Sequence, residues 1–386
     1  MSGLSGFMMR FGDATLDVGD SRLDRQPLGA EFLAMARAFV ADTYEGCTYH
    51  RQRLDRAGVT PDAVRSFEDF ERIPLLGPSD VSSTAEFSLL PDRMVGALHD
   101  GGLFDFRPEE RIAKKFTTTG STGRPKVSYY TVADWEAGSA QVVRMFQHIP
   151  PANFSRIFNC FNPGHVGGKV FEDTFNRVGC TVENKHFTLQ KPEDVIRQLY
   201  NGIPELGGFN CLCMPPCLPP GLKVGKGGTL DELLNADVDN YIGAKIRVIL
   251  TAGAPRDLPE FRLKERVWEA NELAGAERTA FVDLYGCAEV ALACADCEHN
   301  DGVHLMQGHT YTEIVNAETG KRVKPGERGL VAFTGFKHAS RYLRYLIGDE
   351  ATFVADPCRC GRVSPRLKDI TRVMDKDRLR QGCAAG

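Results

Sequence analysis

The stretch Phe116-Thr117-Thr118-Thr119-Gly120-Ser121-Thr122-Gly123-Arg124-Pro125-Lys126 is the most informative part of the sequence. Its hydroxyl residues and glycines allow side-chain O–H groups and backbone N–H groups to face one anion. Lys126 adds a positive charge. The stretch is not a Walker loop, because no Gly-Lys-Ser/Thr occurs in it. Residues that favour β-strands follow it at 127–131. The stretch predicts a phosphate-binding loop between two strands; the alternative is an ordinary Ser/Thr/Gly hairpin turn.

The residues after this loop predict an α/β fold. Three runs have the apolar, β-branched composition of buried strands, at residues 156–161, 245–250 and 279–284. Helical patterns lie between them at residues 192–200 and 258–273. Strands that alternate with helices are typical of a sheet with crossover helices. We therefore expect an α/β protein built from layered sheets with crossover helices.

The two ends of the chain have different patterns. Apolar residues at helical spacing dominate residues 28–100, whereas strand and turn patterns dominate residues 310–355. We predict four parts in chain order: an N-terminal helical part at 1–104, an α/β core with the phosphate loop at 105–304, a small antiparallel β subdomain at 305–375, and a hinge remnant or tail at 376–386.

The composition excludes several functional classes. The formal net charge of −4 gives no broad basic surface for a nucleic acid. No apolar run approaches the roughly 20 residues that cross a bilayer, and residues 1–25 lack the apolar segment of a signal peptide. We expect a cytoplasmic protein with no nucleic-acid or membrane partner, whose 12 cysteines stay reduced.

Three further motifs follow the phosphate loop: Thr251-Ala252-Gly253-Ala254-Pro255, Tyr285-Gly286-Cys287-Ala288-Glu289 and Tyr345-Leu346-Ile347-Gly348-Asp349. Together with the loop, and in this order, they resemble the adenylate-forming superfamily of acyl-CoA synthetases, adenylation domains and luciferases. Segments 44–50, 57–59, 73–75, 159–168 and 301–304 are similar to its phenylacetate-CoA ligase branch. The resemblance covers essentially the whole chain and implies ATP-dependent activation of a carboxylic acid.

The resemblance implies nucleotide-binding roles for residues of these motifs. Lys126 and the loop would hold the ATP phosphates, and Glu289 would bind Mg²⁺, which prefers carboxylate and phosphate oxygens. Tyr285 would stack on adenine, and Asp349 and Arg372 would fix the ribose. An isolated Asp or Glu has an ordinary alternative, as a turn residue or a solvated side chain. The whole nucleotide set is Thr117, Thr118, Thr119, Gly120, Ser121, Thr122, Gly123, Gly253, Ala254, Pro255, Asp283, Tyr285, Gly286, Asp349 and Arg372.

In the resembling ligases an aromatic acid lies beside the adenylate. The resemblance places its pocket at Phe161, His165, Val166, Gly167, Gly168, Phe209 and Ala288. Ala288 stands where the family usually has Thr. His165 is either a catalytic residue that contacts the substrate carboxylate or a satisfied structural histidine, and both interpretations stay open.

Two close cysteine pairs, Cys294-x-x-Cys297 and Cys358-x-Cys360, lie far apart in the sequence, with His304 after the first pair. Two thiolate pairs suit a tetrahedral structural Zn²⁺; the alternative is a chance cluster of reduced thiols. The resembling branch has Cys-x6-His followed by Cys-x-Cys-Gly-Arg, which implies that the ligands are Cys297, His304, Cys358 and Cys360, with Cys294 in reserve. No role is assigned to Cys211, Cys213 and Cys217.

The resemblance also concerns the end of the chain. Family members continue for about 100 residues, the size of a small domain, beyond the point that corresponds to Gly386. That domain carries a lysine used in adenylation and admits CoA. We therefore expect an adenylating enzyme that is not a complete CoA ligase, with a partner enzyme, either a reductase or an acyl acceptor. A shortened adenylate-forming protein of phenazine antibiotic biosynthesis is similar in this respect.

Three functions stay open at this point. The favoured one is activation of an aromatic carboxylic acid with ATP and Mg²⁺. The second is a binding protein that keeps its affinity for a nucleotide or aryl acid but has no turnover. The third is a synthetase that holds the acyl group on a cysteine such as Cys287. A homodimer is compatible with each of them.

Overall fold

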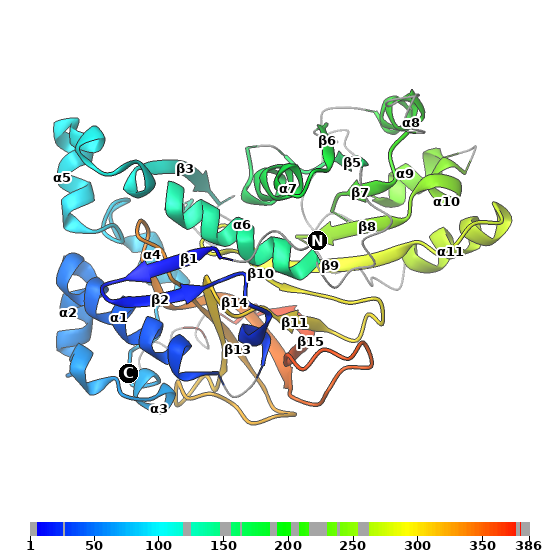
Figure 1. Ribbon diagram of the computed structural model, residues 1–386. Helices are drawn as coiled ribbons and strands as arrows, with labels where there is room; N and C mark the ends of the chain where they lie inside the picture. Colours follow the sequence, from blue (N-terminus) through cyan, green and yellow to red (C-terminus); the bar gives the residue numbers. More distant parts are fainter. Residues whose placement is uncertain are drawn as a thin grey trace. The chain divides into compact units, whose positions relative to one another are not determined.

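The computed structural model describes residues 6–25, 28–118, 125–146, 156–162, 164–185, 191–201, 208–215, 230–237, 240–253, 262–375 and 379. The elements, traced in Figure 1, fall into two compact units. The first comprises residues 1–144, 287–293 and 304–386, and the second comprises residues 145–286 and 294–303. Among the described helices, none combines the length and the apolar character that a bilayer crossing requires. The division into four parts stays a prediction.

The first unit begins with a short β-hairpin and continues with helices. Strands β1 (Met8–Phe11) and β2 (Ala14–Asp17) pair antiparallel across Gly12, whose φ of +53° suits the tight turn. The helices confirm the pattern of residues 28–100, whereas the sequence pattern does not indicate the hairpin, whose four-residue strands show little alternation. The helices are α1 (Ala30–Gly46), α2 (Thr48–Arg56), α3 (Phe67–Phe70), α4 (Pro78–Ser83) and α5 (Asp92–Asp100).

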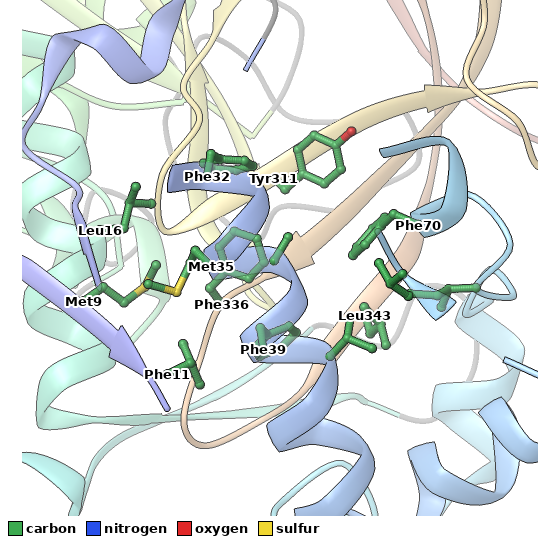
Figure 2. Packing of buried hydrophobic residues seen from close by; sticks show 14 of the residues in the cluster. Met9, Phe11, Leu16, Phe32, Met35, Phe39, Phe70, Tyr311, Phe336 and Leu343 are labelled. Carbon is green, nitrogen blue, oxygen red and sulfur yellow. The ribbon is translucent and has the colours of Figure 1, made fainter. Parts of the chain in front are cut away.

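An aromatic core joins α1 to the C-terminal strands of the same unit, as Figure 2 shows. Phe32, Met35 and Phe39 lie on one face of α1 and are fully buried. Phe336 packs edge to face against Phe32 and Phe39, with ring centroids 5.5 and 5.2 Å apart. Each aromatic pair contributes roughly 0.5–1.5 kcal/mol beyond the burial of its area. This core therefore anchors the segment that follows Phe336.

Two antiparallel groups of strands complete the first unit. Strands β3 (Ile112–Thr117) and β4 (Val127–Thr131) form a hairpin, and helix α6 (Val132–Phe146) follows. The second group confirms the strand pattern at residues 310–355; its strands pair in chain order, namely β12 (Thr310–Val315), β13 (Arg328–Gly335), β14 (Tyr342–Val354) and β15 (Arg366–Arg372). The shorter strands β10 (Ala291–Ala295) and β11 (Val303–Leu305) precede it in the sequence.

The second unit contains a parallel sheet in the order β6-β5-β7-β8-β9. Its strands are β5 (Arg156–Asn159), β6 (Thr181–Asn184), β7 (Cys211–Cys213), β8 (Val248–Ala252) and β9 (Ala280–Cys287). Each crossover carries helices: α7 (Val166–Arg177), α8 (Pro192–Asn201), α9 (Leu230–Ala236) with α10 (Tyr241–Lys245), and α11 (Leu263–Leu273). Apolar residues of strands and helices share one core. The predicted α/β class with crossover helices is confirmed.

Candidate functional site

The base of the phosphate loop is a hydrogen-bonded hairpin. Thr117 pairs with Val127 in the β3–β4 register. Beyond this pair, Thr118 N–H donates to the Lys126 carbonyl and Lys126 N–H donates to Thr118 Oγ1, both at 2.9 Å. The Thr118 hydroxyl therefore closes the loop at its base. The other predicted loop residues lie outside the described residues, namely Thr119, Gly120, Ser121, Thr122 and Gly123.

The side chain of Lys126 enters a buried polar cluster with Glu289 and Tyr345. Lys126 Nζ lies 2.5 Å from the Tyr345 hydroxyl and 3.1 Å from Glu289 Oε1. The Tyr345 hydroxyl donates to the same Glu289 oxygen at 2.9 Å. The side chains of Lys126 and Glu289 are only 7% and 4% exposed. A cation, a phenol and a carboxylate thus meet away from bulk water, where electrostatic interactions are strong.

Glu289 is held in its ionised form. Burial alone would raise its pKa, but the charge of Lys126 and hydrogen bonds from Lys126 and Tyr345 bring the pKa below the ordinary value for a glutamate. The effect on Tyr345 is opposite, because burial and the charge of Glu289 raise the pKa of its phenol well above the ordinary value. A charged acceptor and a neutral donor therefore lie side by side.

Asp349 and Arg372 are neighbours across β14 and β15. They are register partners, and Arg372 Nη1 lies 2.9 Å from Asp349 Oδ1 and 2.9 Å from the Ile347 carbonyl oxygen. Gly348 has a φ of +90°, and a Cβ there would lie 3.2 Å from the guanidinium carbon of Arg372. Glycine alone combines this conformation with this close approach. The structure thus brings the two predicted ribose residues together and explains the glycine that precedes Asp349 within β14.

In the second unit, the predicted adenine-side residues lie at the carboxyl ends of β8 and β9. Thr251 Oγ1 donates to Asp283 Oδ1 at 2.9 Å, and the two residues are register partners. Gly253 follows β8 with a φ of +86°, so glycine serves the turn here. Tyr285 and Gly286 lie near the end of β9 and are partly exposed. Ligands of open α/β sheets bind at such strand ends. Ala254 and Pro255 lie outside the described residues.

The turn from β5 into α7 holds most of the predicted acyl-pocket residues. His165 is the N-cap of α7, and its Nδ1 accepts a hydrogen bond from Gly167 N–H at 3.3 Å. This contact gives one ring nitrogen a structural role, and the catalytic role of His165 stays a prediction. Val166, Gly167 and Gly168 are buried at the start of the helix. Phe161, before the turn, is partly exposed.

Phe209 and Ala288 lie in packed surroundings. Phe209 is 3% exposed in the core of the second unit, with its ring centroid 5.0 Å from that of Phe158. Ala288 is buried in the first unit, and its carbonyl oxygen accepts a hydrogen bond from the Tyr130 hydroxyl at 2.8 Å. Their roles as walls of an acyl pocket stay predictions.

Gly168 should tolerate no side chain, unlike its neighbour. A Cβ at Gly168 would lie 2.3 Å from the Asn162 carbonyl oxygen, whereas one at Gly167 would lie 3.7 Å from His165 Nδ1. We expect Gly168→Ala to lower the free energy of unfolding by about 1–3 kcal/mol, the usual cost of overpacking. Gly167→Ala should leave it unchanged or raise it, because alanine favours helix. Urea unfolding of both variants is the measurement, and equal stabilities would show that the turn relaxes around the methyl group.

A second polar group contains all four predicted zinc ligands. The donor atoms of Cys297, His304, Cys358 and Cys360 all lie within 4.8 Å of one another. Three of these residues are buried, and Cys360 is partly exposed. Three thiols and one imidazole fit a tetrahedral Zn²⁺, which binds such ligands at about 2.0–2.3 Å. The chemistry and the spacing of the donors are thus suitable for this metal.

Local contacts orient these donors. His304 Nδ1 lies 2.9 Å from Ser364 Oγ, while Nε2 lies 3.5 Å from Cys360 Sγ. A histidine ligand commonly has its second nitrogen fixed in this way. Gly361, with a φ of +82°, donates its N–H to the Cys358 carbonyl at 3.0 Å and closes the turn that carries both cysteines.

The other cysteines have different surroundings. Cys294, the reserve ligand, is buried in β10 and is not a member of the group. Cys211 and Cys213 are buried in β7, and burial raises the pKa of Cys213 well above the ordinary thiol value. Cys217 lies outside the described residues. The structure therefore favours Cys297 over Cys294 as a ligand.

The sequence does not indicate the contacts of Tyr345 and Ser364. In the sequence, Tyr345 is only the first residue of the motif that ends in the predicted ribose residue Asp349. In the structure, its hydroxyl contacts both Lys126 and Glu289. Ser364 lies 60 positions from His304, so no local pattern connects the two. For Tyr345, a signal was available, because it begins a motif that already contains functional residues.

Known proteins resemble the chain in sequence and in fold. It is 25% identical over 354 residues to a phenylacetate-coenzyme A ligase of Thermus thermophilus, which covers 90% of this chain and 71% of that protein. It is 23% identical over 333 residues to the phenylacetate-coenzyme A ligase of Escherichia coli, covering 84% and 67%. A solved structure of 2-hydroxyisobutyryl-CoA ligase with 2-HIB-AMP matches with a TM-score of 0.71 at 20% identity, over 95% of this chain and 75% of that chain. No family model matches the sequence.

The motif order, the fold and these relatives agree with one another. Lys126, Glu289 and Asp349 occupy the motif positions where the resemblance places them, and the structure pairs each with a polar partner. The sequence relatives and the shared fold support placing the chain in the adenylate-forming superfamily, in the phenylacetate-CoA ligase-like branch that its motifs resemble.

Proposed function

We propose that the protein uses ATP to convert an aromatic carboxylic acid into an acyl-adenylate and pyrophosphate. The observation that carries the proposal is the buried cluster of Lys126, Glu289 and Tyr345 beside the base of the phosphate loop. The likeness to phenylacetate-coenzyme A ligases supports it. Attack of a carboxylate on the α-phosphorus of ATP brings two anions together and develops charge on phosphoryl oxygens. Fixed cations and hydrogen-bond donors are what this step requires.

Each member of the cluster has a distinct role in this proposal. Lys126 binds phosphate oxygens of ATP together with the loop. Glu289 would hold Mg²⁺, because its carboxylate is kept ionised and this cation prefers such oxygens. When bound, Mg²⁺ neutralises negative charge on the phosphates. The hydroxyl of Tyr345 holds the side chains of Lys126 and Glu289 in position through hydrogen bonds to both.

The remaining predicted residues bind the two substrates. We propose that Asp349, held by Arg372, accepts hydrogen bonds from the ribose hydroxyls. Tyr285 would stack on adenine near the turn at Gly253. The turn from β5 into α7 would bind the acid, where Phe161 offers an aromatic face.

The cysteine and histidine group is proposed to hold a structural Zn²⁺. Cys297, His304, Cys358 and Cys360 would fill the four positions of a tetrahedral site, which leaves no open position for catalysis. The contact of His304 with Ser364 supports this role, because it directs the second ring nitrogen toward the thiols.

The two alternatives make different demands on the site. A binding protein would bind ATP without turning it over. A synthetase that transfers the acyl group to Cys287 as a thioester needs a reactive thiolate at that residue. Burial and the charge of Glu289 instead raise the pKa of Cys287 well above the ordinary thiol value. This environment disfavours Cys287 as an acyl acceptor.

ATP–pyrophosphate exchange with phenylacetate and other aryl acids tests the proposed function. We expect exchange that requires both Mg²⁺ and an aryl acid. ATP binding without exchange for every acid of the panel would favour the binding protein.

The fate of the adenylate is a further part of the proposal. On the resemblance to the phenazine protein, a partner enzyme would reduce the acyl group or accept it, and the chain would act as a homodimer or a monomer with that partner. Mass spectrometry of the reaction with and without CoA addresses this step. Acyl-CoA formed within seconds would show that no partner is needed.

A further inference from the structure

Lys337, in the connection between β13 and β14, is fully buried in the first unit. Its Nζ donates to Ser128 Oγ at 2.7 Å and to the Tyr129 carbonyl at 3.3 Å. The same nitrogen lies 3.7 Å from the ring centroid of Tyr130 and 5.2 Å from that of Tyr342. A hydroxyl, a carbonyl and two aromatic faces therefore surround the ammonium group.

A lysine in this position is costly for stability. Removing an ammonium group from water is unfavourable unless its partners compensate fully. Burial lowers the pKa of Lys337 to about 7, against the attraction of Asp134, Cys287 and Glu289. Methionine would fill a similar space without the charge. A residue that lowers stability at its position is expected mainly at functional sites, where it contributes to function.

The hydrogen bonds of Lys337 lead to the backbone beside Glu289. Ser128 Oγ accepts from Lys337, so its single O–H is free to donate, and it donates to the Glu289 carbonyl at 3.3 Å. Tyr130, whose ring faces the ammonium, donates its hydroxyl to the Ala288 carbonyl at 2.8 Å. Two consecutive carbonyls are thus held by groups that Lys337 contacts directly.

We propose that Lys337 is a positioning residue that fixes Ser128 and Tyr130, and through them the backbone that carries the Glu289 carboxylate. The inference rests on the proposed role of Glu289 as the Mg²⁺ ligand. It goes beyond that role because Lys337 acts through two other side chains and does not bind the nucleotide or the metal. Its loss should weaken the contribution of Mg²⁺ to ATP binding, not ATP binding as such.

Titration calorimetry of ATP into the full chain, with and without Mg²⁺, measures this contribution. Lys337→Met is compared with the wild type and with Lys321→Met, which removes an exposed lysine of the same unit. We expect the tightening of ATP binding by Mg²⁺ to fall about 10-fold in Lys337→Met, as for other residues that orient a metal ligand. The Kd without Mg²⁺ should not change, and Lys321→Met should match the wild type. Equal weakening with and without Mg²⁺ would overturn the inference.

A double-mutant cycle tests the route through Ser128. Ser128→Ala should reproduce part of the loss, and Lys337→Met should cost less in the Ser128→Ala background than in the wild type. Fully additive losses would show that Lys337 acts by another path. Thermal unfolding of the same samples, with Lys337→Met melting at or above the wild type, shows that the loss is not caused by unfolding.

A crystal structure of Lys337→Met separates this inference from the adenylation proposal. We expect the Ser128–Glu289 hydrogen bond to be lost and the Glu289 carboxylate to leave the Tyr345 hydroxyl. An unmoved Glu289 would overturn the positioning role whatever the protein binds. A displaced Glu289 in a chain whose wild type binds no ATP would support the positioning role and reject the proposed function.

Discussion

Glu289→Gln is expected to reduce Mg²⁺-dependent ATP–pyrophosphate exchange by about 10²–10³-fold, the loss typical of removing one preorganised charge-stabilising group. Glutamine keeps the shape of the side chain and can still accept the hydrogen bond from Tyr345, but it brings no charge for the metal. The substitution also leaves Lys126 buried without its carboxylate. Breaking a buried ion pair in this way costs about 3–5 kcal/mol, so stability should fall as well.

Asp24→Asn is a control for removing a carboxylate from an ion pair elsewhere in the first unit. Asp24 and Arg144 form another ion pair of the first unit, at 3.1 Å, in which Arg144 is fully buried and Asp24 is partly buried. Burial raises the pKa of Asp24 to about 6, so its carboxylate is ionised in an alkaline assay. Because burial disfavours the charge of Asp24, Asp24→Asn should cost less stability than Glu289→Gln and should keep exchange, whereas Glu289→Gln should lose exchange below its own melting temperature. Unchanged exchange in Glu289→Gln would remove this residue from the metal role.

The double substitution Cys358→Ser with Cys360→Ser is expected to remove one Zn²⁺ per chain and to destabilise the protein strongly. Structural Zn²⁺ contributes on the order of 10 kcal/mol of apparent binding energy in small domains. Its loss should therefore lower the melting temperature far more than an ordinary core substitution does. Metal analysis of protein purified without added zinc, together with calorimetry of the same samples, measures both effects.

Cys294→Ser tests the assignment of the ligands. Cys294 is buried close in sequence to Cys297 but does not belong to the group of four. This variant should keep its metal and most of its stability. A wild-type protein without metal would reject the zinc proposal, and loss of metal in Cys294→Ser alone would reject the ligand set.

Regular elements with a clear hydrophobic pattern could be predicted from the sequence. The run at residues 279–284 forms most of the first part of strand β9, and its apolar residues Phe281, Val282 and Leu284 are buried, as the sequence pattern predicts. The phosphate loop was likewise predicted to lie between strands, and β3 and β4 flank it. The hairpin of β1 and β2 could not be predicted, because each strand has four residues and gains its burial from α1.

Site residues that belong to a family motif could be predicted from the sequence. Contacts between residues far apart in the sequence could not. The family motifs indicate Lys126, Glu289, Asp349 and Arg372, and the structure joins them in pairs. Lys126 and Tyr345 are 219 positions apart in the sequence, so no local sequence pattern indicates their contact. Lys337 is a further example, because a single lysine beside apolar residues is usually one that reaches solvent.

The most direct measurement of acyl-adenylate formation follows the carboxylate oxygen. Phenylacetate labelled with oxygen-18 in its carboxylate is incubated with the protein, ATP and Mg²⁺, and the products are analysed by mass spectrometry. Attack of the carboxylate on the α-phosphorus makes the labelled oxygen the bridge of the adenylate, and hydrolysis at the carbonyl carbon leaves it in AMP. We predict AMP with one oxygen-18 atom and release of pyrophosphate. Unlabelled AMP, or ADP with the label in inorganic phosphate, would contradict the proposed chemistry.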